Sequence, residues 1–204
     1  MSKAISLSII LTSIIEPGVG FPKLSRSNPS AIEVLFKYSI WLLLVPPLIS
    51  WFGASNFGWH LGADEPLVLS SGSLVVVGVG YFLALLFGFL STAFISRWMA
   101  STYGAKSSLG LHFALITVVG APLAVASIGQ WYPHIFLNLL ILIPAMIWSM
   151  YLLYKGIPVV LEISPEKGML MASSLVGWLL VAAVSLLGIT LGLWSMGIGP
   201  FLGV

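Results

Sequence analysis

The sequence has no cysteine and very little charge, and these two absences limit the classes of protein it can belong to. Only 7% of its 204 residues are charged, whereas 59% are hydrophobic. A soluble domain typically carries about 25% charged residues, and part of any compact soluble domain must face water. The composition therefore predicts an integral membrane protein. The lack of cysteine excludes disulfides, thiol catalysis and thiolate metal sites.

Sequence motifs for catalysis and cofactor binding are also missing. The chain contains no HExxH, no GxSxG and no phosphate-binding loop. Its net charge of +2 gives no reason to expect a nucleic-acid partner. Intramembrane enzymes and ion-coupled transporters usually keep ionisable groups within the bilayer, and here no Asp, Glu, Lys or Arg falls in the middle of a predicted span. We therefore expect a non-enzymatic protein with no cofactor and no catalytic or metal-binding residues.

Long uncharged runs predict five membrane-spanning helices and an all-α fold. About 20 apolar residues cross a hydrocarbon core roughly 30 Å thick. The run at 107–154 is long enough for two helices, and GQWYPH at 129–134 separates them. A β-barrel would need alternating segments rather than solid apolar runs. The expected helices lie near residues 35–53, 74–97, 109–129, 135–154 and 169–194.

Lysine and arginine are distributed asymmetrically between the predicted connections. They precede the first span and occur between the second and third spans and between the fourth and fifth, whereas the loops at 54–72 and 129–134 contain none. The positive-inside rule places basic connections in the cytoplasm. The pattern therefore predicts a cytoplasmic N-terminus and an external C-terminus.

Residues 1–31 are expected to form a region ahead of a single transmembrane domain at 32–204. Residues 4–15 are apolar but would reach only about 18 Å as a helix, which is too short to span. Their polar and apolar side chains gather on opposite sides, which favours an amphipathic helix in the membrane interface. A signal peptide is the alternative, but its cleavage would leave basic residues outside. Residues 17–31, rich in Gly, Pro and Ser, are expected to be a linker.

Small residues recur every four positions on two of the predicted helices. They are Gly80, Ala84 and Gly88 on the second helix, and Gly188 and Gly192 on the last. Such stripes let helices approach closely. Packing within the chain is the simpler expectation, and association between copies into a homo-oligomer is the other.

Prolines occur within three predicted spans, at Pro46–Pro47, Pro122 and Pro144. Each frees backbone carbonyl groups that must find partners inside the bilayer. The resulting kinks can open a cavity for a solute or a lipid tail, or can simply shape the bundle. Asn138 is expected to form a hydrogen bond across helices.

Histidine and acidic residues offer only weak candidate sites. His112 and His134 are expected at membrane interfaces, where a hydrated imidazole needs no special role. His60, Asp64 and Glu65 could form an ion site on the outer side. Neighbouring glycines favour a solvated loop there instead.

The stretch YLLYKGIPVVLEISPEKG, residues 151–168, places charge and proline between two apolar runs. Here the chain is expected to emerge between the fourth and fifth spans. Lys155 is expected to end the fourth helix, and Pro165 to occupy the first turn of the fifth. An acid–base cluster that includes Glu162 and Lys167 is the alternative.

The same stretch resembles the signature of the Yip family, named for proteins that interact with Ypt/Rab GTPases, and especially its small bacterial inner-membrane branch. The pattern is an aromatic-rich helix end, then Gly-Ile-Pro, then a Pro-Glu-Lys-Gly-like turn. The matching residues are Tyr151, Tyr154, Gly156, Ile157, Pro158, Pro165, Glu166, Lys167 and Gly168. Weaker matches occur at 57–62, 97–104 and 120–124, and the resemblance covers roughly residues 30–195.

The resemblance implies a multi-pass protein of the bacterial inner membrane. Eukaryotic members are similar to trafficking adaptors that bind prenylated GTPases, and they carry an Asp-Leu-Tyr-Gly-Pro-like element that this sequence lacks. We therefore do not expect GTPase binding. We expect a membrane adaptor or scaffold that contacts lipid, self-associates and presents loops 97–108 and 155–168 to a cytoplasmic protein. Its expected partner surface is Tyr151, Tyr154, Lys155, Gly156, Ile157, Pro158, Glu166 and Lys167. The alternative is a small-solute or lipid transporter or channel with a proline-kinked cavity.

Overall fold

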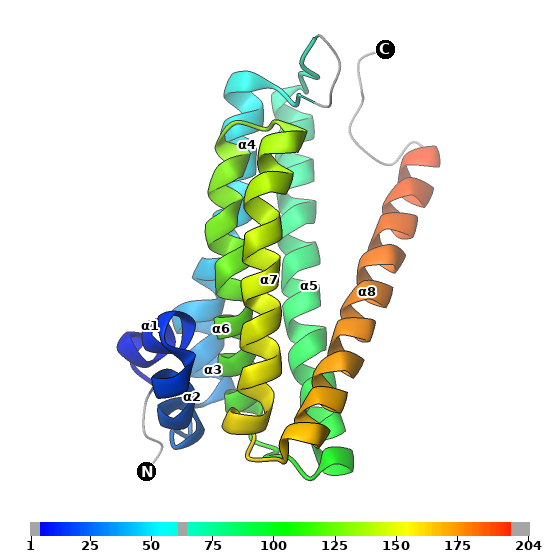
Figure 1. Cartoon of the computed structure of the whole chain (residues 1–204). Helices are drawn as coiled ribbons and strands as arrows, with labels where there is room; N and C mark the ends of the chain where they lie inside the picture. Colours follow the sequence, from blue (N-terminus) through cyan, green and yellow to red (C-terminus); the bar gives the residue numbers. More distant parts are fainter. Residues whose placement is uncertain (1–4, 61–64, 197–204) are drawn as a thin grey trace.

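The fold is a helical bundle, seen in a computed structural model that describes residues 5–60 and 65–196 (Figure 1). Five helical stretches are long and apolar enough to cross a membrane, which confirms the predicted all-α, five-span architecture. They are Ala31–Phe57, Ser71–Tyr103, Leu109–Trp131, Ile135–Val160 and Pro165–Leu193.

The helices extend further than the hydropathy pattern predicted. Their bounds are α1 Leu7–Ile15, α2 Pro17–Ser25, α3 Ala31–Val34, α4 Ile40–Phe57, α5 Ser71–Tyr103, α6 Leu109–Ala126, α7 Ile135–Val160 and α8 Pro165–Ser195. A π-helical turn at Leu35–Ser39 joins α3 to α4, and a 3-10 turn at Ser127–Trp131 follows α6. The expectation that Lys155 ends the fourth span is wrong, because α7 runs on through Pro158 to Val160.

Local capping explains where the long helices begin and end. The Ser70 side chain accepts a hydrogen bond from the Ser73 backbone N–H at the start of α5. α5 ends at Gly104, whose φ of 71° is the left-handed conformation that glycine adopts without steric penalty. α8 begins at Pro165, as predicted, because proline already has the φ that a first helical residue needs.

α6 lies at the centre of the bundle. Within its most apolar window 61% of residues are buried, against 11% in the windows of α7 and α8. A helix that is apolar on all sides is expected to be surrounded by protein. Figure 1 shows α8 leaning away from the other spans toward its C-terminal end. The bundle is therefore closely packed around α6 and more open next to α8.

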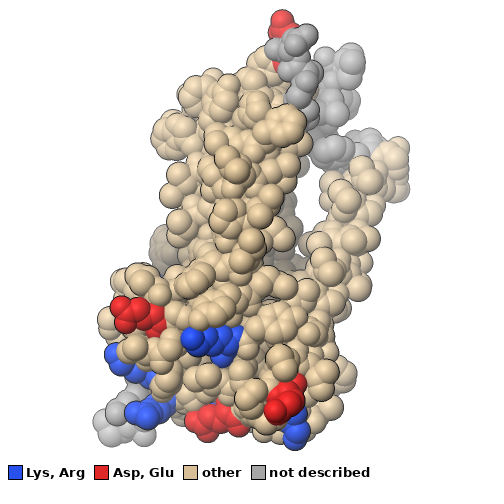
Figure 2. Space-filling model, viewed as in Figure 1, with Lys and Arg blue, Asp and Glu red and all other residues tan. Residues whose placement is uncertain are grey.

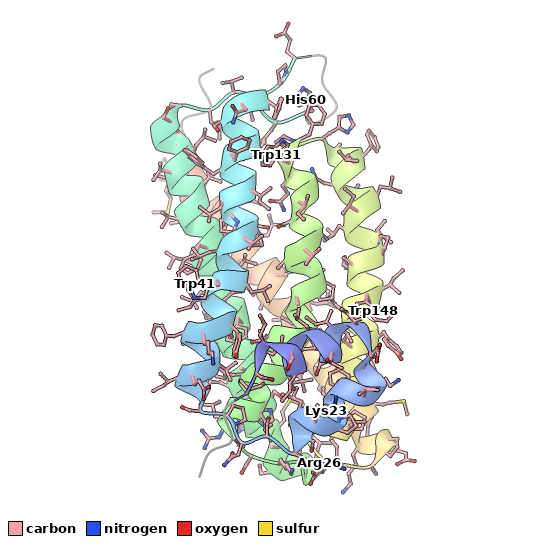
Figure 3. All side chains as sticks on the ribbon, turned by 90° about the vertical axis from the view of Figure 1, so that its left-hand side faces the viewer. Lys23, Arg26, Trp41, His60, Trp131 and Trp148 are labelled. Atoms are coloured by element: carbon pink, nitrogen blue, oxygen red, sulfur yellow. The ribbon has the colours of Figure 1, made fainter. Side chains whose placement is uncertain are left out.

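The N-terminal segment forms two short helices that pack against one end of the bundle. Residues 17–31 were expected to be a linker, but Pro17–Ser25 is helical, and Phe21 in this helix is fully buried. α1 is anchored by Trp148 of α7, whose indole N–H donates to the Ile14 carbonyl at 3.0 Å (Figure 3). The amphipathic helix was expected to lie in the membrane interface, and that placement stays a prediction.

Basic side chains gather at the end of the bundle where α2 packs. Figure 2 shows the visible Lys and Arg residues at this end only, with an acidic residue at the other. We call these the basic end and the opposite end. The opposite end carries Trp131 and His60 (Figure 3). Here the chain forms two isolated bridges, between Trp59 and Leu67 and between His60 and His134.

Candidate functional site

The candidate site is the basic end, where the Gly-Ile-Pro segment of α7 meets α2 and α6. A Cβ atom at Gly156 would lie 2.7 Å from Leu115 Cδ1 and 3.0 Å from Phe21 Cζ. Both of those side chains are fully buried and have little room to move. Gly156 is therefore the residue that lets three helices meet, which explains a glycine in an otherwise bulky helix end.

The turn between α7 and α8 is closed by two signature residues. A Cβ at Gly168 would lie 2.8 Å from Pro158 Cβ, so the proline ring packs directly on the first turns of α8. Ile157, between Gly156 and Pro158, is fully buried. The Gly-Ile-Pro and Pro-Glu-Lys-Gly parts of the signature thus pack against each other across the turn.

Glu162 occupies the position after α7 where glycine is usual. Its φ of 54° is left-handed, and the Ile163 N–H donates back to the Pro158 carbonyl at 3.1 Å. This bond pattern is a Schellman helix end. A non-glycine residue in this conformation costs on the order of 1–3 kcal/mol, so other interactions must hold Glu162 in place.

Those interactions come from Lys106 and Ser25. Glu162 Oε1 accepts from Lys106 Nζ at 2.7 Å and from the Ser25 hydroxyl at 2.8 Å. Lys106 Nζ also donates to the Ser25 carbonyl at 3.0 Å. We call this set the clasp. It joins α2 to the connections α5–α6 and α7–α8, which are far apart in sequence.

The clasp alters the acidity of its carboxylate. The hydrogen bond from Lys106, followed by that from Ser25, holds the pKa of Glu162 below its usual value near 4.5. Glu162 is thus an ionised binding group at neutral pH. The alternative acid–base cluster is not formed, because Glu166 and Lys167 are exposed, and the ion pairs among the described residues are Lys106–Glu162 and Lys37–Glu33.

His112 supports the clasp through a hydrogen bond with the backbone of Lys106. It was expected to be hydrated at an interface, but it is fully buried. Its Nε2 lies 2.9 Å from the Lys106 carbonyl and its Nδ1 lies 2.8 Å from Ser96 Oγ. A carbonyl can only accept, so Nε2 carries the proton and Nδ1 accepts from the serine. The neutral imidazole therefore fixes the Lys106 backbone to α5.

The aromatic residues of the signature lie on two sides of α7. The Tyr154 hydroxyl is 2.9 Å from Ser173 Oγ on α8. Tyr151 is half-exposed, accepts from Lys155 Nζ at 2.9 Å and stacks near Trp148. Tyr154 therefore helps to position α8, whereas Tyr151 and Lys155 form an accessible pair.

The signature thus divides into accessible residues and buried ones. Tyr151, Lys155, Glu166 and Lys167 can contact another molecule, but Gly156 and Ile157 cannot, since both are buried. Lys106 lies in the loop 97–108 that was expected to face a partner, but its contacts with Glu162 and Ser25 were not predicted. Sequence reasoning missed Ser25 and His112 as parts of this site. No periodic pattern or motif distinguishes them, and the Ser25–Glu162 contact joins residues 137 positions apart.

The glycines of these stripes make no close contacts with the part of the chain that the structure describes. An added Cβ at Gly80, Gly88, Gly188 or Gly192 would meet nothing within 4 Å. Close intramolecular packing, which we expected of these residues, is therefore not observed. Asn138 also differs from expectation, because its amide donates to the His134 carbonyl on its own helix rather than across helices.

Neither histidine near the opposite end forms part of a metal site in the described chain. Among residues 5–60 and 65–196 no group of three or more His, Asp or Glu could hold an ion. Asp64, which we considered with His60 and Glu65, lies outside the described residues. The His60 and His134 rings are 6.3 Å apart and stacked with Tyr132 nearby.

Comparison with known proteins agrees with the resemblance seen in the sequence. The model of the Yip1 domain matches residues 11–198. The chain is 26% identical over 174 residues to the protein named "Inner membrane protein YohC" in two strains of Escherichia coli, covering 85% of this chain and 89% of each relative. No solved structure matches. With its Gly-Ile-Pro segment, its five apolar helices and a domain match over nearly its whole length, this chain belongs to the Yip1-domain family of integral membrane proteins.

Proposed function

We propose that the protein is a non-enzymatic scaffold of the bacterial inner membrane, and that its basic end is a platform for a cytoplasmic protein. The membrane assignment is supported by the name of the Escherichia coli relatives. The clasp is the observation that carries the proposal. It combines α2 and two connections into one surface, although these segments are not adjacent in sequence.

The exposed residues around the clasp give this platform its chemistry. Tyr151 and Lys155 form one accessible pair, and Glu166 and Lys167 lie on the first turn of α8. Basic and acidic groups alternate over this surface, which favours recognition of a protein surface with both signs of charge. Gly156, Ile157 and Pro158 act indirectly, by fixing the helix ends that carry these side chains.

Self-association through α5 and α8 is part of the same proposal. Gly80, Gly188 and Gly192 leave open space beside both helices. Close approach of helices in membranes depends on such small residues. A second copy could therefore pack where the chain itself does not.

The test of the platform is site-specific photo-crosslinking in intact cells. A photoreactive residue placed at Lys155 or Lys167 is expected to capture one defined protein, identified by mass spectrometry. The matched control carries the same residue at Trp131, at the opposite end. Glu162→Gln, which weakens the clasp by removing the negative charge that pairs with Lys106, is expected to reduce the capture. Capture of lipid alone from both basic-end positions would contradict the proposal.

A second candidate function, the handling of membrane lipid, is favoured by a separate observation. The bundle contains a mainly apolar cavity beside Pro46, Tyr81 and Gly88 that is partly open to its surface. Its volume is far larger than that of ordinary packing defects, which seldom exceed a water molecule.

A further inference from the structure

Two adjoining cavities, both partly open to the surface of the bundle, extend from its opposite end past its middle. The larger has a volume of about 430 Å³ and is lined mainly by apolar side chains of α4 to α8, among them Pro46, Phe89, Ile116 and Leu153. The smaller, of about 360 Å³, reaches Trp59 and Pro133 near the opposite end. Volumes in this range are typical of ligand sites.

The two cavities meet at a small polar group. Tyr81, Gln130 and Asn138 line both of them. The Gln130 amide donates to the Tyr81 hydroxyl at 3.2 Å, but its carbonyl oxygen Oε1 is buried and has no hydrogen-bond partner among the described residues. A buried polar atom without a hydrogen bond is unfavourable, so this amide is the place where a ligand with a polar group would be held.

The position of this polar group matches the depth of a lipid ester. Gln130 directly precedes Trp131, and tryptophans gather at the membrane–water interface. From there the larger cavity runs toward the middle of the bundle, where its lining includes Phe89 and Leu153. The site therefore has one polar end at interface depth and one apolar end in the bilayer core.

We propose that this cavity binds one acyl chain of a phospholipid, with the polar group at the head of that chain hydrogen-bonded to Gln130. The inference rests on the second candidate function and is independent of the platform. If a methylene occupies about the volume of a water molecule, roughly 30 Å³, the larger cavity holds on the order of a dozen methylenes. The lining then regains the dispersion contacts that an empty void lacks.

Water and a second copy of the chain fit this space less well. Away from its polar group, the larger cavity is lined mainly by apolar side chains such as Phe89, Ile116 and Leu153, which favour hydrocarbon over water. One turn of a helix with its side chains occupies about 400 Å³ or more, so no helix of a partner can enter beyond a single turn. A flexible hydrocarbon chain, which the surrounding bilayer supplies at high concentration, fits the shape and the chemistry.

Photolabelling in vesicles tests the proposal on the full chain. The protein is reconstituted in phosphatidylethanolamine and phosphatidylglycerol containing a phospholipid with a diazirine at the end of one acyl chain. Label is expected on Phe89 or Ile116, which are only 7% and 8% exposed. Label confined to exposed residues such as Leu83 and Phe87 would overturn the proposal.

A second probe tests the direction of the chain. A diazirine beside the ester carbonyl is expected to label Tyr81 or Gln130 and to leave Phe89 unlabelled. The opposite result would show that the lipid lies the other way round and would overturn the assignment of Gln130.

Two glycines of α5 give a matched pair of variants. Gly88→Leu projects into the larger cavity, whereas Gly78→Leu adds the same side chain at a position that does not line it, and neither position is sterically blocked. Gly88→Leu is expected to lower the labelling of Ile116 about fivefold or more, since overpacking a filled site costs 1–3 kcal/mol. Gly78→Leu is expected to leave it unchanged. Equal labelling of both variants would contradict the proposal.

If Gly88→Leu fails to fold, Gln130→Leu keeps the proposal testable. This variant removes the amide and fills no part of the larger cavity. It is expected to reduce labelling of Tyr81 by the carbonyl-side probe while the protein remains folded. Unchanged labelling would show that Gln130 does not hold the lipid.

Discussion

The two halves of the bundle differ in how closely their helices approach. At the basic end a Cβ atom would overlap neighbouring backbone at Gly20 and Gly110, and would press on side chains at Gly156. Beside α8 and in the half toward the opposite end, Gly80 and Gly188 face open space. The same residue type thus makes close contacts in one half and none in the other.

Gly53 is the exception, since it packs on the backbone of Gln130 and Trp131 near the opposite end. That contact joins α4 to the 3-10 turn and leaves α8 free. The basic end is therefore held together within the chain, whereas the face beside α8 is left open. A second copy is the occupant proposed above for that face, and lipid is the occupant proposed for the cavity in the bundle.

The largest loss of stability is expected when a side chain is added to a glycine in the closely packed basic end. Gly110→Ala would drive its Cβ into the Pro29 carbonyl, which is backbone and cannot move aside. We expect a loss of about 3 kcal/mol or more of stability, seen as a strongly lowered melting temperature in detergent. Gly120→Ala, on the same helix but facing no atom within 4 Å, is the control. It is expected to be neutral or mildly stabilising, since alanine favours helix. Equal loss in both variants would contradict the comparison.

A smaller effect is expected when the buried histidine is removed. His112→Leu leaves the Lys106 carbonyl and the Ser96 hydroxyl without their partner. Each unsatisfied buried group costs about 1–3 kcal/mol, so the melting temperature should fall clearly. His134→Leu is the control, because that ring stacks at the opposite end near Tyr132. A His112→Leu variant as stable as His134→Leu would show that the buried imidazole does not support the clasp.

The smallest effect is expected from the clasp itself, because its side chains are partly exposed. Glu162→Gln should loosen α2, so trypsin should cut at Lys23 and Arg26 several-fold faster in vesicles with the basic end accessible. Glu33→Gln removes the carboxylate of the exposed 4.0 Å pair with Lys37 and serves as the control. Cleavage rates that match in both variants would argue against the clasp.

The same variant predicts a pH dependence. The folded pKa of Glu162 is lowered by Lys106 and Ser25, so its contribution is complete above the unfolded value near pH 4.5 and is lost as pH falls through the folded pKa. Stability of the wild type should therefore decrease more steeply in this acidic range than that of Glu162→Gln. Parallel pH profiles of the melting temperature would contradict the assigned role of this carboxylate.

The number of spans and the start of α8 at Pro165 could be predicted, because hydropathy and helix-start signals are local properties of the sequence. The unequal distribution of Lys and Arg between the connections could also be read directly from the sequence. The clasp could not, since Ser25 lies in a segment without periodicity and contacts a residue 137 positions away. The helix at Pro17–Ser25 was missed because its glycines and prolines disfavour helix, and the burial of Phe21 and Leu24 overrides that preference.

The role of Gly156 could be predicted only in part from the sequence. The signature marked it as part of the site, but only the structure shows that Phe21 and Leu115 require its missing side chain. The open glycines of α5 and α8 show the converse, because a spacing typical of helix contacts is present without a contact in the chain.

Distances between paired spin labels test the central claim most directly, and the absence of native cysteine makes the labelling specific. One pair, at Lys23 and Lys167, reports on the basic end. The other, at Val76 and Leu191, spans α5 and α8 toward the opposite end. In vesicles we predict a narrow distribution for the first pair and, for the second, a separation beyond the 8–10 Å between the axes of packed helices. A short, narrow distance for Val76 and Leu191 would show that α8 closes on the bundle and would contradict the account.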